Sequence, residues 1–518
     1  MNSDLEEAEL LAFLAQPLSY PDGCDSIERI ETHAARVFLA RGKAYKIKKR
    51  VSLAYLDFST LERRHHALQR ELEINAPHAP QLYLRVVPIV RNASGHLQFS
   101  GDGTVIDYAL VMNRFDQDQV LARFIAAGPL SLPLCTELAH MVASYHQECP
   151  VAGDARGAAR MQTTISQVAA GIRAAFYSTQ QKIAGNAADQ LVAAFDTLAP
   201  LLNERGRAGC VRRCHGDLHL ENIVLLASGP TAFDALEFDE ALATIDVLYD
   251  LAFLLMDLDF RGDRAAANRI LNAYIEIAPI GNELEGLKAL PAFLAARAAI
   301  RAVVAIERAR QNVQGDAARD SQRAASYMAL AGACLTPHTP VLIAIGGLSG
   351  TGKSTLASAI APLINPSPGA VHLRSDVERK HLFGVPVTQR LTPDHYSAAI
   401  SGEVYAALLK KAGRALAAGH PVIVDAVSAK PAERRALEDL ATSTGVRFTG
   451  LWLDAPLDVK IDRVTARRGD ASDAGSDVAR AQEGYDLDAI NWPRINAGGS
   501  FSHALDGAKA ALARAGLL

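Results

Sequence analysis

Three side chains between positions 217 and 234 have the types and the spacing that phosphoryl transfer requires. Asp217 and Asn222 lie five positions apart in one predicted loop, and Asp234 follows the next predicted strand. Asp217 could accept the proton of an attacking hydroxyl, while Asn222 and Asp234 could hold a magnesium ion between the phosphates of ATP. The alternative is a structural turn rich in Asp and Asn. The order and spacing of the set favour a kinase site.

A glycine-rich stretch near position 350 has the pattern of a phosphate-binding loop. It matches G-x-x-x-x-G-K-[ST] and stands between an apolar run, 341–345, and a predicted helix, 356–363. Backbone N–H groups of such a loop converge on phosphate oxygens, and the helix dipole favours their negative charge. Lys353 would neutralise the β and γ phosphates, and Ser354 would give its hydroxyl to magnesium. The residues expected to contact the nucleotide are Gly347, Ser349, Gly350, Thr351, Gly352, Lys353, Ser354 and Thr355.

Two carboxylates follow predicted strands of the same half. Asp376 comes after the strand 371–373 and could take the proton of an acceptor hydroxyl, while Arg379 could hold an anionic part of that acceptor. The alternative for Asp376 is the N-cap of a helix. Asp425 ends a short apolar strand that begins at Val422, so it is placed like a metal-binding Walker B carboxylate.

Arginines gather on a predicted helix further along this half. Arg463, Arg467 and Arg468 precede a polar segment, 469–474. Arginine-rich lids of this kind close over ATP phosphates and exclude water. We therefore expect Arg463 to bind the nucleotide and Arg467 to act in catalysis. A solvated basic helix is the alternative.

The loop around Asp217 resembles the catalytic loop of the aminoglycoside phosphotransferase and choline kinase-like families. The resemblance rests on the run from His215 to Asn222 and on Asp234. It implies a protein-kinase-like fold, with Asp217 as the base and with Asn222 and Asp234 as magnesium ligands. It also implies that His215 braces the loop.

A kinase of this kind also needs a lysine and a glutamate in its small lobe. Lys46 and Lys48 lie on one face of a predicted strand, and Lys46 is the preferred contact to the phosphates; a basic edge strand is the alternative. By resemblance, Glu71 would pair with that lysine, unless Glu62 does so or both belong to a solvated face. Met112 would lie at the hinge that receives adenine.

The second half has a resemblance of its own. Residues 341 to about 485 resemble small-molecule P-loop kinases, such as gluconate kinase, and the related polynucleotide kinases, on the features around Asp376, Asp425 and Arg463. Together the halves resemble a bacterial family in which an aminoglycoside phosphotransferase-like domain is fused to such a kinase domain. The resemblance covers nearly the whole chain and implies ATP binding and phosphotransfer, without identifying an acceptor.

The predicted architecture has two domains, of mixed α/β and α+β class, because 518 residues exceed what one core holds. Residues 1–335 would form a two-lobed kinase-like domain, with a five-stranded small lobe at about 25–115 and a helical lobe at about 116–335. A proline-containing linker, 336–340, would lead to a P-loop domain at 341–518, a parallel sheet with flanking helices.

Composition narrows the class of protein. The chain is 49% hydrophobic and 21% charged with a net charge of −4, which is typical of soluble globular proteins and argues against a general nucleic-acid or membrane-surface binder. The apolar runs are too short to span a bilayer, and the acidic start is not a signal peptide. The six cysteines lack metal-ligand or disulfide-framework spacing, which fits a reducing cytoplasm.

We therefore expect a cytoplasmic phosphotransferase that uses ATP and Mg²⁺ at two sites, each phosphorylating a hydroxyl of a small molecule. Residues 32–36 contain no glycine where the glycine-rich loop of a kinase would stand. This departure motivates an alternative in which the first domain is a regulatory or binding pseudokinase fused to one active P-loop kinase. A nucleic-acid end kinase is a further alternative, disfavoured by the acidic charge balance.

Overall fold

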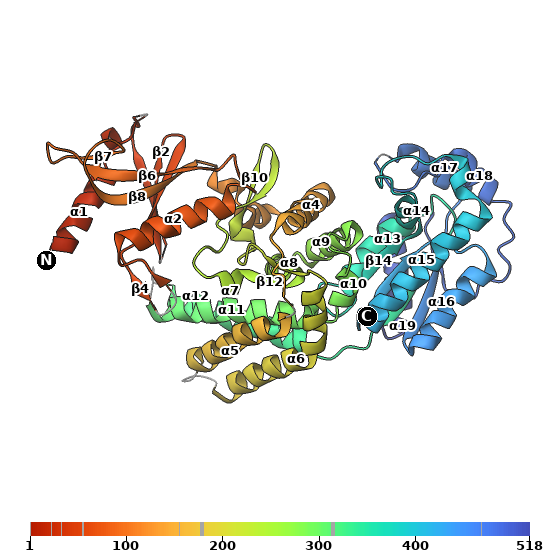
Figure 1. The fold of residues 1–518 in the computed structure, drawn as a ribbon. Coiled ribbons are helices and arrows are strands. Elements are labelled where there is room, and N and C mark those ends of the chain that lie inside the picture. The colour runs from red at the N-terminus through yellow and green to blue at the C-terminus, as the bar shows by residue number, and fades with distance from the viewer. Residues whose placement is uncertain are drawn as a thin grey trace. The chain divides into compact units, whose positions relative to one another are not determined.

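The computed structural model divides into two compact units (Figure 1). The linker predicted at 336–340 falls inside the second of them. The structure describes residues 2–21, 23–32, 34–53, 56–154, 156–176, 181–311, 316–467 and 469–518. The first unit comprises Met1–Leu130, Ser144–Gly153 and Val211–Leu254, and the second comprises Ser131–Ala143, Asp154–Cys210 and Leu255–Leu518.

The first unit contains an antiparallel sheet of six strands in the order β1-β2-β3-β8-β6-β7. The prediction of five strands was wrong, because β7 has only three residues and so carries no alternating pattern that a sequence could reveal. The strands are β1 (Ile27–Glu31), β2 (Ala35–Ala40), β3 (Lys43–Lys48), β6 (Tyr83–Arg91), β7 (Leu97–Phe99) and β8 (Thr104–Asn113).

Helix α2 (Leu61–Asn75) lies against this sheet. Thr60 caps its start by accepting a hydrogen bond from the Arg63 backbone N–H at 3.3 Å, as expected for an N-cap threonine. Leu68 and Glu71, one turn apart on the same face, are both fully buried. The helix thus carries a carboxylate into the interior of the unit.

Two short antiparallel strand pairs lie within residues 211–246, the segment that carries Asp217 and Asp234. β9 (Val211–Arg213) pairs with β12 (Thr244–Asp246), and β10 (Ile223–Leu226) forms a hairpin with β11 (Gly229–Ala232). The loops that carry Asp217 and Asp234 begin and end at these strands. The remaining elements of this unit are α1 (Asn2–Leu14), β4 (Ser52–Leu53), β5 (Leu56–Asp57), α3 (Leu121–Phe124), α7 (Glu240–Ala243) and, shared with the second unit, α4 (Leu132–Glu148) and α8 (Val247–Phe260).

The second unit contains the parallel sheet predicted for the P-loop half, and the sheet has five strands in the order β14-β15-β13-β16-β17. Ile343, Ile345 and Leu451 are fully buried, as strands covered on both faces require. Because parallel strands end at one edge of a sheet, the loops after them meet there. The strands are β13 (Val341–Gly346), β14 (Val371–Arg374), β15 (Val422–Asp425), β16 (Arg447–Asp454) and β17 (Arg494–Asn496).

Helices make up the rest of the second unit. No helix within the described ranges is long and apolar enough to cross a membrane. The helices before the P-loop sheet are α5 (Gly157–Ala175), α6 (Gln181–Arg207), α9 (Arg264–Ile277), α10 (Glu283–Gly286), α11 (Leu290–Gln311) and α12 (Ala317–Leu335). Those that accompany it are α13 (Lys353–Ile360), α14 (Ser375–Leu382), α15 (Ala398–Ala417), α16 (Pro431–Thr444), α17 (Leu457–Ala466), α18 (Ser476–Gln482) and α19 (Phe501–Arg514).

Helix α9 covers the open edge of the parallel sheet, where β14 is the outermost strand. The backbone N–H of His372 donates to the Asn272 side chain at 2.7 Å, and the amides of Asn268 and Asn272 donate to the Ala370 carbonyl at 3.1 and 3.2 Å. These bonds satisfy groups that an edge strand would otherwise leave unpaired. Since α9 precedes residue 336, a fragment holding only the P-loop half would lose this cover of β14.

A buried histidine gives the P-loop half a pH-dependent stability. The Nε2–H of His420 donates to the Gly369 carbonyl at 2.9 Å, and burial lowers the pKa of His420 to about 4. The unfolded chain protonates His420 more readily than the folded chain does. The contribution of His420 to the free energy of unfolding is therefore complete above pH 6.5 and is lost as the pH falls toward 4. At pH 5 we expect the free energy of unfolding to be lower by about 2 kcal/mol.

His420→Gln keeps an N–H donor but cannot titrate, so its free energy of unfolding should depend less on pH between 6.5 and 4. Urea unfolding followed by tryptophan fluorescence measures this, because the two tryptophans of the chain, Trp452 and Trp492, both lie in the P-loop half. Equal pH dependence in the two proteins would contradict the assignment.

Candidate functional site

The loop of the first unit brings Asp217 and Asn222 into direct contact. The Asn222 amide donates to both the backbone carbonyl and the Oδ2 of Asp217, at 3.0 Å each. Asn222 is buried, whereas the Asp217 side chain is 40% exposed. The carboxylate is therefore oriented by the loop and still accessible to a bound molecule.

Asp250 anchors the backbone at the start of this loop. Its two oxygens accept the backbone N–H groups of His215 and Gly216, at 3.1 and 2.9 Å, and its Oδ2 lies 3.3 Å from His146 Nε2. His215 in turn donates from Nε2 to the Phe233 carbonyl at 3.0 Å. The imidazole thus ties the Asp217 loop to the segment that carries Asp234, which is the geometry expected of a brace.

Lys46 lies between Glu71, its predicted partner, and Asp234, the predicted magnesium ligand. Its Nζ is 2.7 Å from Glu71 Oε1 on α2 and 2.6 Å from Asp234 Oδ1. The Asp234 backbone N–H donates to the Tyr83 hydroxyl at 2.9 Å, which fixes the carboxylate near the sheet. Burial would lower the pKa of Lys46, but Asp234 and Glu71 outweigh burial and hold it well above its usual range. Lys46 therefore stays charged.

Lys48 shares the same glutamate from the other side. Its Nζ lies 2.7 Å from Glu71 Oε2 and 2.6 Å from Glu237 Oε1. Burial raises the pKa of Glu237 despite the neighbouring Lys48. Sequence reasoning missed Glu237; the only local signal was its place three residues after Asp234. The alternative partner Glu62 is exposed in the first turn of α2, away from this cluster.

The two lysines should respond differently to substitution by methionine. Lys48→Met removes the cation beside the buried Glu237 and one of the two lysines that pair with Glu71, so we expect it to destabilise the protein by about 3–5 kcal/mol. Lys46→Met removes the lysine beside Asp234, so we expect it chiefly to weaken ATP binding at this site. Thermal unfolding and ATP titration of both variants test this. If Lys48→Met weakens ATP binding and leaves stability unchanged, the two roles are reversed.

The predicted hinge residue lies near the end of β8, an inner strand of the sheet. Met112 of β8 is buried and faces Ala44 of β3 and Tyr83 of β6 in the strand register. The segment at 32–36, which lacks the kinase glycines, runs from the end of β1 into the first two residues of β2, and residue 33 lies outside the described residues. The structure thus places Lys46 and Met112 on the sheet, and Glu71 on the helix α2 that lies against it.

The phosphate-binding loop of the second unit has the predicted strand–loop–helix setting, between β13 and α13. Gly350 and Gly352 have φ of 85° and 90°, where a side chain would be strained, and a Cβ at Gly350 would lie 2.6 Å from the Lys460 carbonyl. Lys353 begins α13, and its Nζ donates to the Leu348 carbonyl at 3.2 Å. The lysine therefore folds back over its own loop.

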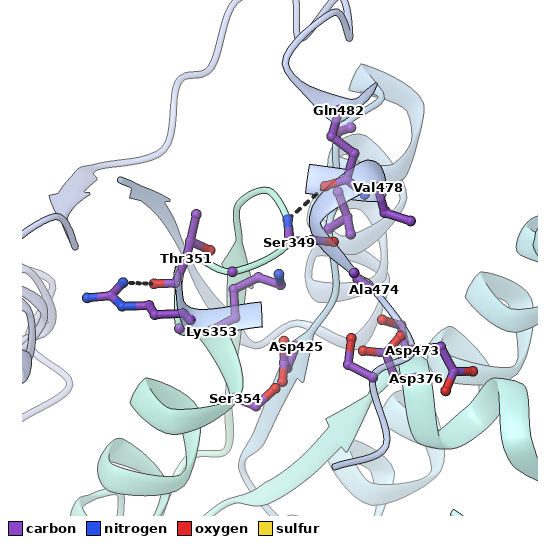
Figure 2. A pocket seen from close by; sticks show the side chains of 18 of the residues that line it. Ser349, Thr351, Lys353, Ser354, Asp376, Asp425, Asp473, Ala474, Val478 and Gln482 are labelled. Atoms are coloured by element: carbon purple, nitrogen blue, oxygen red, sulfur yellow. Dashed lines mark hydrogen bonds between the residues drawn. The ribbon is translucent and has the colours of Figure 1, made fainter. Parts of the chain in front are cut away.

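The carboxylates predicted for this half gather around Lys353. Asp425 ends β15 beside Ile345 of β13, and its Oδ2 lies 3.3 Å from His372 Nε2. Burial raises the pKa of Asp425, but His372, Lys353 and Arg374 outweigh burial and lower it to about 2. Asp376 and Lys353 share one cavity lining (Figure 2). Asp376 is the second residue of α14, whose N-cap is Arg374, so the capping alternative for Asp376 is wrong.

Arg463 and Arg467 of the predicted lid line the same cavity as the loop. The Arg463 guanidinium donates to the Thr351 carbonyl at 3.4 Å. Arg467 Nε lies 3.4 Å from Asp470, which also pairs with Arg374 at 2.5 Å. Arg468 is outside the described residues. Asp470 therefore connects the lid to the end of β14, a contact that the sequence pattern did not reveal.

A cavity of about 1630 Å³ extends from the P-loop past Asp376. The Arg379 guanidinium lies over the Tyr396 ring at 4.6 Å and donates to the His395 carbonyl at 2.8 Å. Within the part of the chain that the structure describes, the buried Nε of Arg379 has no hydrogen-bond partner. Tyr396 is held in turn by Asp473 at 2.6 Å. The lining of this cavity thus includes an oriented cation.

Two family models match the chain, one in each half. Residues 60–290 match the model described as "Phosphotransferase enzyme family", and residues 342–485 match the model described as "AAA domain". An uncharacterised protein of Mycobacterium tuberculosis is 30% identical over 483 residues, which cover 90% of this chain and 92% of that protein. The chain belongs to the family of this mycobacterial protein. The resemblance predicted for each half is confirmed, and this family member is a phosphotransferase with two kinase-type domains.

Solved structures resemble each half of this family member separately. A gluconokinase from Sinorhizobium meliloti is 24% identical, covers 34% of this chain and 94% of its own, and has a TM-score of 0.25. The GDP complex of aminoglycoside 2'-phosphotransferase-IIIa is 14% identical, covers 62% and 98%, and has a TM-score of 0.39. The predicted fold class, a kinase-like domain with an antiparallel sheet followed by a parallel-sheet P-loop domain, agrees with the structure.

Proposed function

We propose that this protein transfers the γ-phosphate of ATP to hydroxyl groups of small molecules at two sites, one within residues 1–335 and one within residues 341–518. The observation that carries the proposal is the grouping of Lys353, Asp376 and Asp425 at one end of a parallel sheet, around a cavity large enough for two reactants. The cysteine usage supports a cytoplasmic location.

At the second site, Asp376 would take the proton of the acceptor hydroxyl. The hydroxyl oxygen would form a bond to the γ-phosphorus while the bond from the γ-phosphorus to ADP breaks. Lys353 and the lid arginines Arg463 and Arg467 would neutralise charge that develops on the phosphate oxygens. The buried Nε of Arg379 favours an acceptor that carries an anionic group. Ser354 and Asp425 supply hard oxygen ligands, which fit Mg²⁺; the ion would neutralise phosphate charge.

At the first site, Asp217 would take the proton of the acceptor, and Lys46, held by Glu71, would contact phosphate oxygens. Asn222 and Asp234 supply an amide and a carboxylate oxygen, which again fit Mg²⁺. The adenine would lie near Met112. The intact set of these residues supports an active kinase over a pseudokinase, although residues 32–36 contain no glycine.

A screen of small alcohols, sugars and anionic alcohols for ATP consumption tests the proposal on the full chain. Asp217→Asn and Asp376→Ala should each abolish turnover of a different acceptor, which assigns that acceptor to its site. If every acceptor depends on Asp376 alone, the first domain is a regulatory or binding module. Phosphorylation of nucleic-acid ends, and of no small molecule, would instead establish an end kinase.

A further inference from the structure

Gln482 makes a buried contact with the phosphate-binding loop that no motif indicates. It is the last residue of α18 and is 7% exposed. Its Oε1 accepts the backbone N–H of Ser349 at 2.7 Å (Figure 2). Ser349 is the third residue of the loop, so one of the N–H groups at its apex is bound by the protein itself.

Neighbouring contacts hold the next two residues of the loop in the same way. Gly350 packs so closely on α17 that a Cβ there would lie 2.6 Å from the Lys460 carbonyl. Arg463 of α17 donates to the Thr351 carbonyl at 3.4 Å. Lys460 also pairs with Glu483, directly after Gln482, so α17 and α18 are joined beside the loop. Three successive loop residues are therefore fixed by these two helices.

Gln482 reaches the loop from the side away from the carboxylates. Figure 2 shows it on one side of Ser349, with Asp376 and Asp425 on the other. The amide oxygen therefore does not stand between the loop and the catalytic carboxylates. A bond in this position can orient the loop while the groups facing the carboxylates remain available to phosphate.

We propose that Gln482 is a positioning residue that holds the phosphate-binding loop in the geometry that receives the triphosphate. Gln482 joins the loop to α18, the helix that follows the lid arginines, so that the positions of the loop and the lid are coupled. The inference rests on the proposed ATP site of the P-loop half. It predicts that the Ser349–Gln482 bond is kept when ATP binds, since a preorganised loop binds without first having to be ordered.

The test is Gln482→Met, which keeps the volume of the side chain and removes its acceptor. Titration of the full chain with a fluorescent ATP analogue defines the P-loop component as the binding that Lys353→Ala loses. Gln482→Met should weaken that component about tenfold, the effect of losing one buried hydrogen bond, and should raise the KM for ATP while changing kcat by less than about threefold. Arg480→Ala, on the same helix but exposed and outside the cavity lining, is the matched control and should bind normally.

The outcomes separate this inference from the proposed function. If wild type shows no Lys353-dependent binding, the ATP site itself is refuted. If that binding is present and Gln482→Met leaves it unchanged or tightens it, the positioning role is overturned; tightening would show that Gln482 competes with phosphate. Should Gln482→Met not fold, as judged by its melting temperature, Gln482→Asn provides the second test. Its amide is one methylene too short for the bond, so ATP binding should weaken as well.

Discussion

Lys353→Ala is expected to abolish most phosphotransfer at the second site. The substitution removes the ammonium that would contact the β and γ phosphates, and a hydrogen bond to a charged group contributes about 1.5–3 kcal/mol. ATP affinity should therefore fall about tenfold to a hundredfold, and turnover by about 10² to 10³ if the contact strengthens in the transition state. Tryptophan fluorescence reports the binding, because both tryptophans lie in this half.

The fold should survive this change. Lys353 is only half-buried, and its Nζ donates to the Leu348 carbonyl of its own loop. Burial lowers the pKa of Lys353 although Asp425 and Asp376 oppose that shift, so its charge is held at some cost to stability. Lys410→Ala, an exposed lysine of α15 outside the cavity, is the control and should keep full activity. Full transfer by Lys353→Ala would remove the basis for a kinase in this half.

Asp217→Asn should lower turnover at the first site by about 10² to 10⁴, the usual loss on removing a general base. The new amide oxygen can still accept the hydrogen bond from Asn222, so the loop should keep its shape. ATP affinity should stay nearly unchanged because Asp217 is proposed to contact the acceptor. Turnover of a first-site acceptor and ATP titration of the same protein measure both effects.

Asp239→Asn is the matched control for this prediction. Asp239 caps α7 by accepting the backbone N–H groups of Ala241 and Leu242, at 2.8 and 3.1 Å, and asparagine caps a helix equally well. The control should therefore keep its turnover. Unchanged turnover in Asp217→Asn would refute the assignment of the base.

The motifs predicted the local parts of both sites because each one lies within a few residues of chain. Asp217 and Asn222 are joined by bonds across five positions, and the loop before Lys353 takes its shape from glycines at positive φ. A short motif encodes such geometry through the backbone conformations it allows. The same reasoning located Asp425, because an apolar strand of a parallel sheet ends at the edge where ligands bind.

The parts that sequence reasoning missed depend on long-range packing. Glu237 meets Lys48 across 189 positions, and Gln482 meets Ser349 across 133. No spacing rule relates such pairs, since they are set by which helices and strands pack together. The uncertainty between Lys46 and Lys48 had the same origin. Both lysines lie on one face of β3 and both pair with the buried Glu71. They differ in their second carboxylate, which is Asp234 for Lys46 and Glu237 for Lys48.

The number of nucleotides bound per chain tests the central claim most directly. Equilibrium dialysis of the full chain with a non-hydrolysable ATP analogue and Mg²⁺ should give two nucleotides per wild-type chain. The Lys353→Ala protein should retain one nucleotide per chain when the concentration of the analogue is kept below the weakened Kd of the second site. A single nucleotide in wild type that disappears entirely in Lys353→Ala would contradict the account, because the first domain would then not be an ATP site.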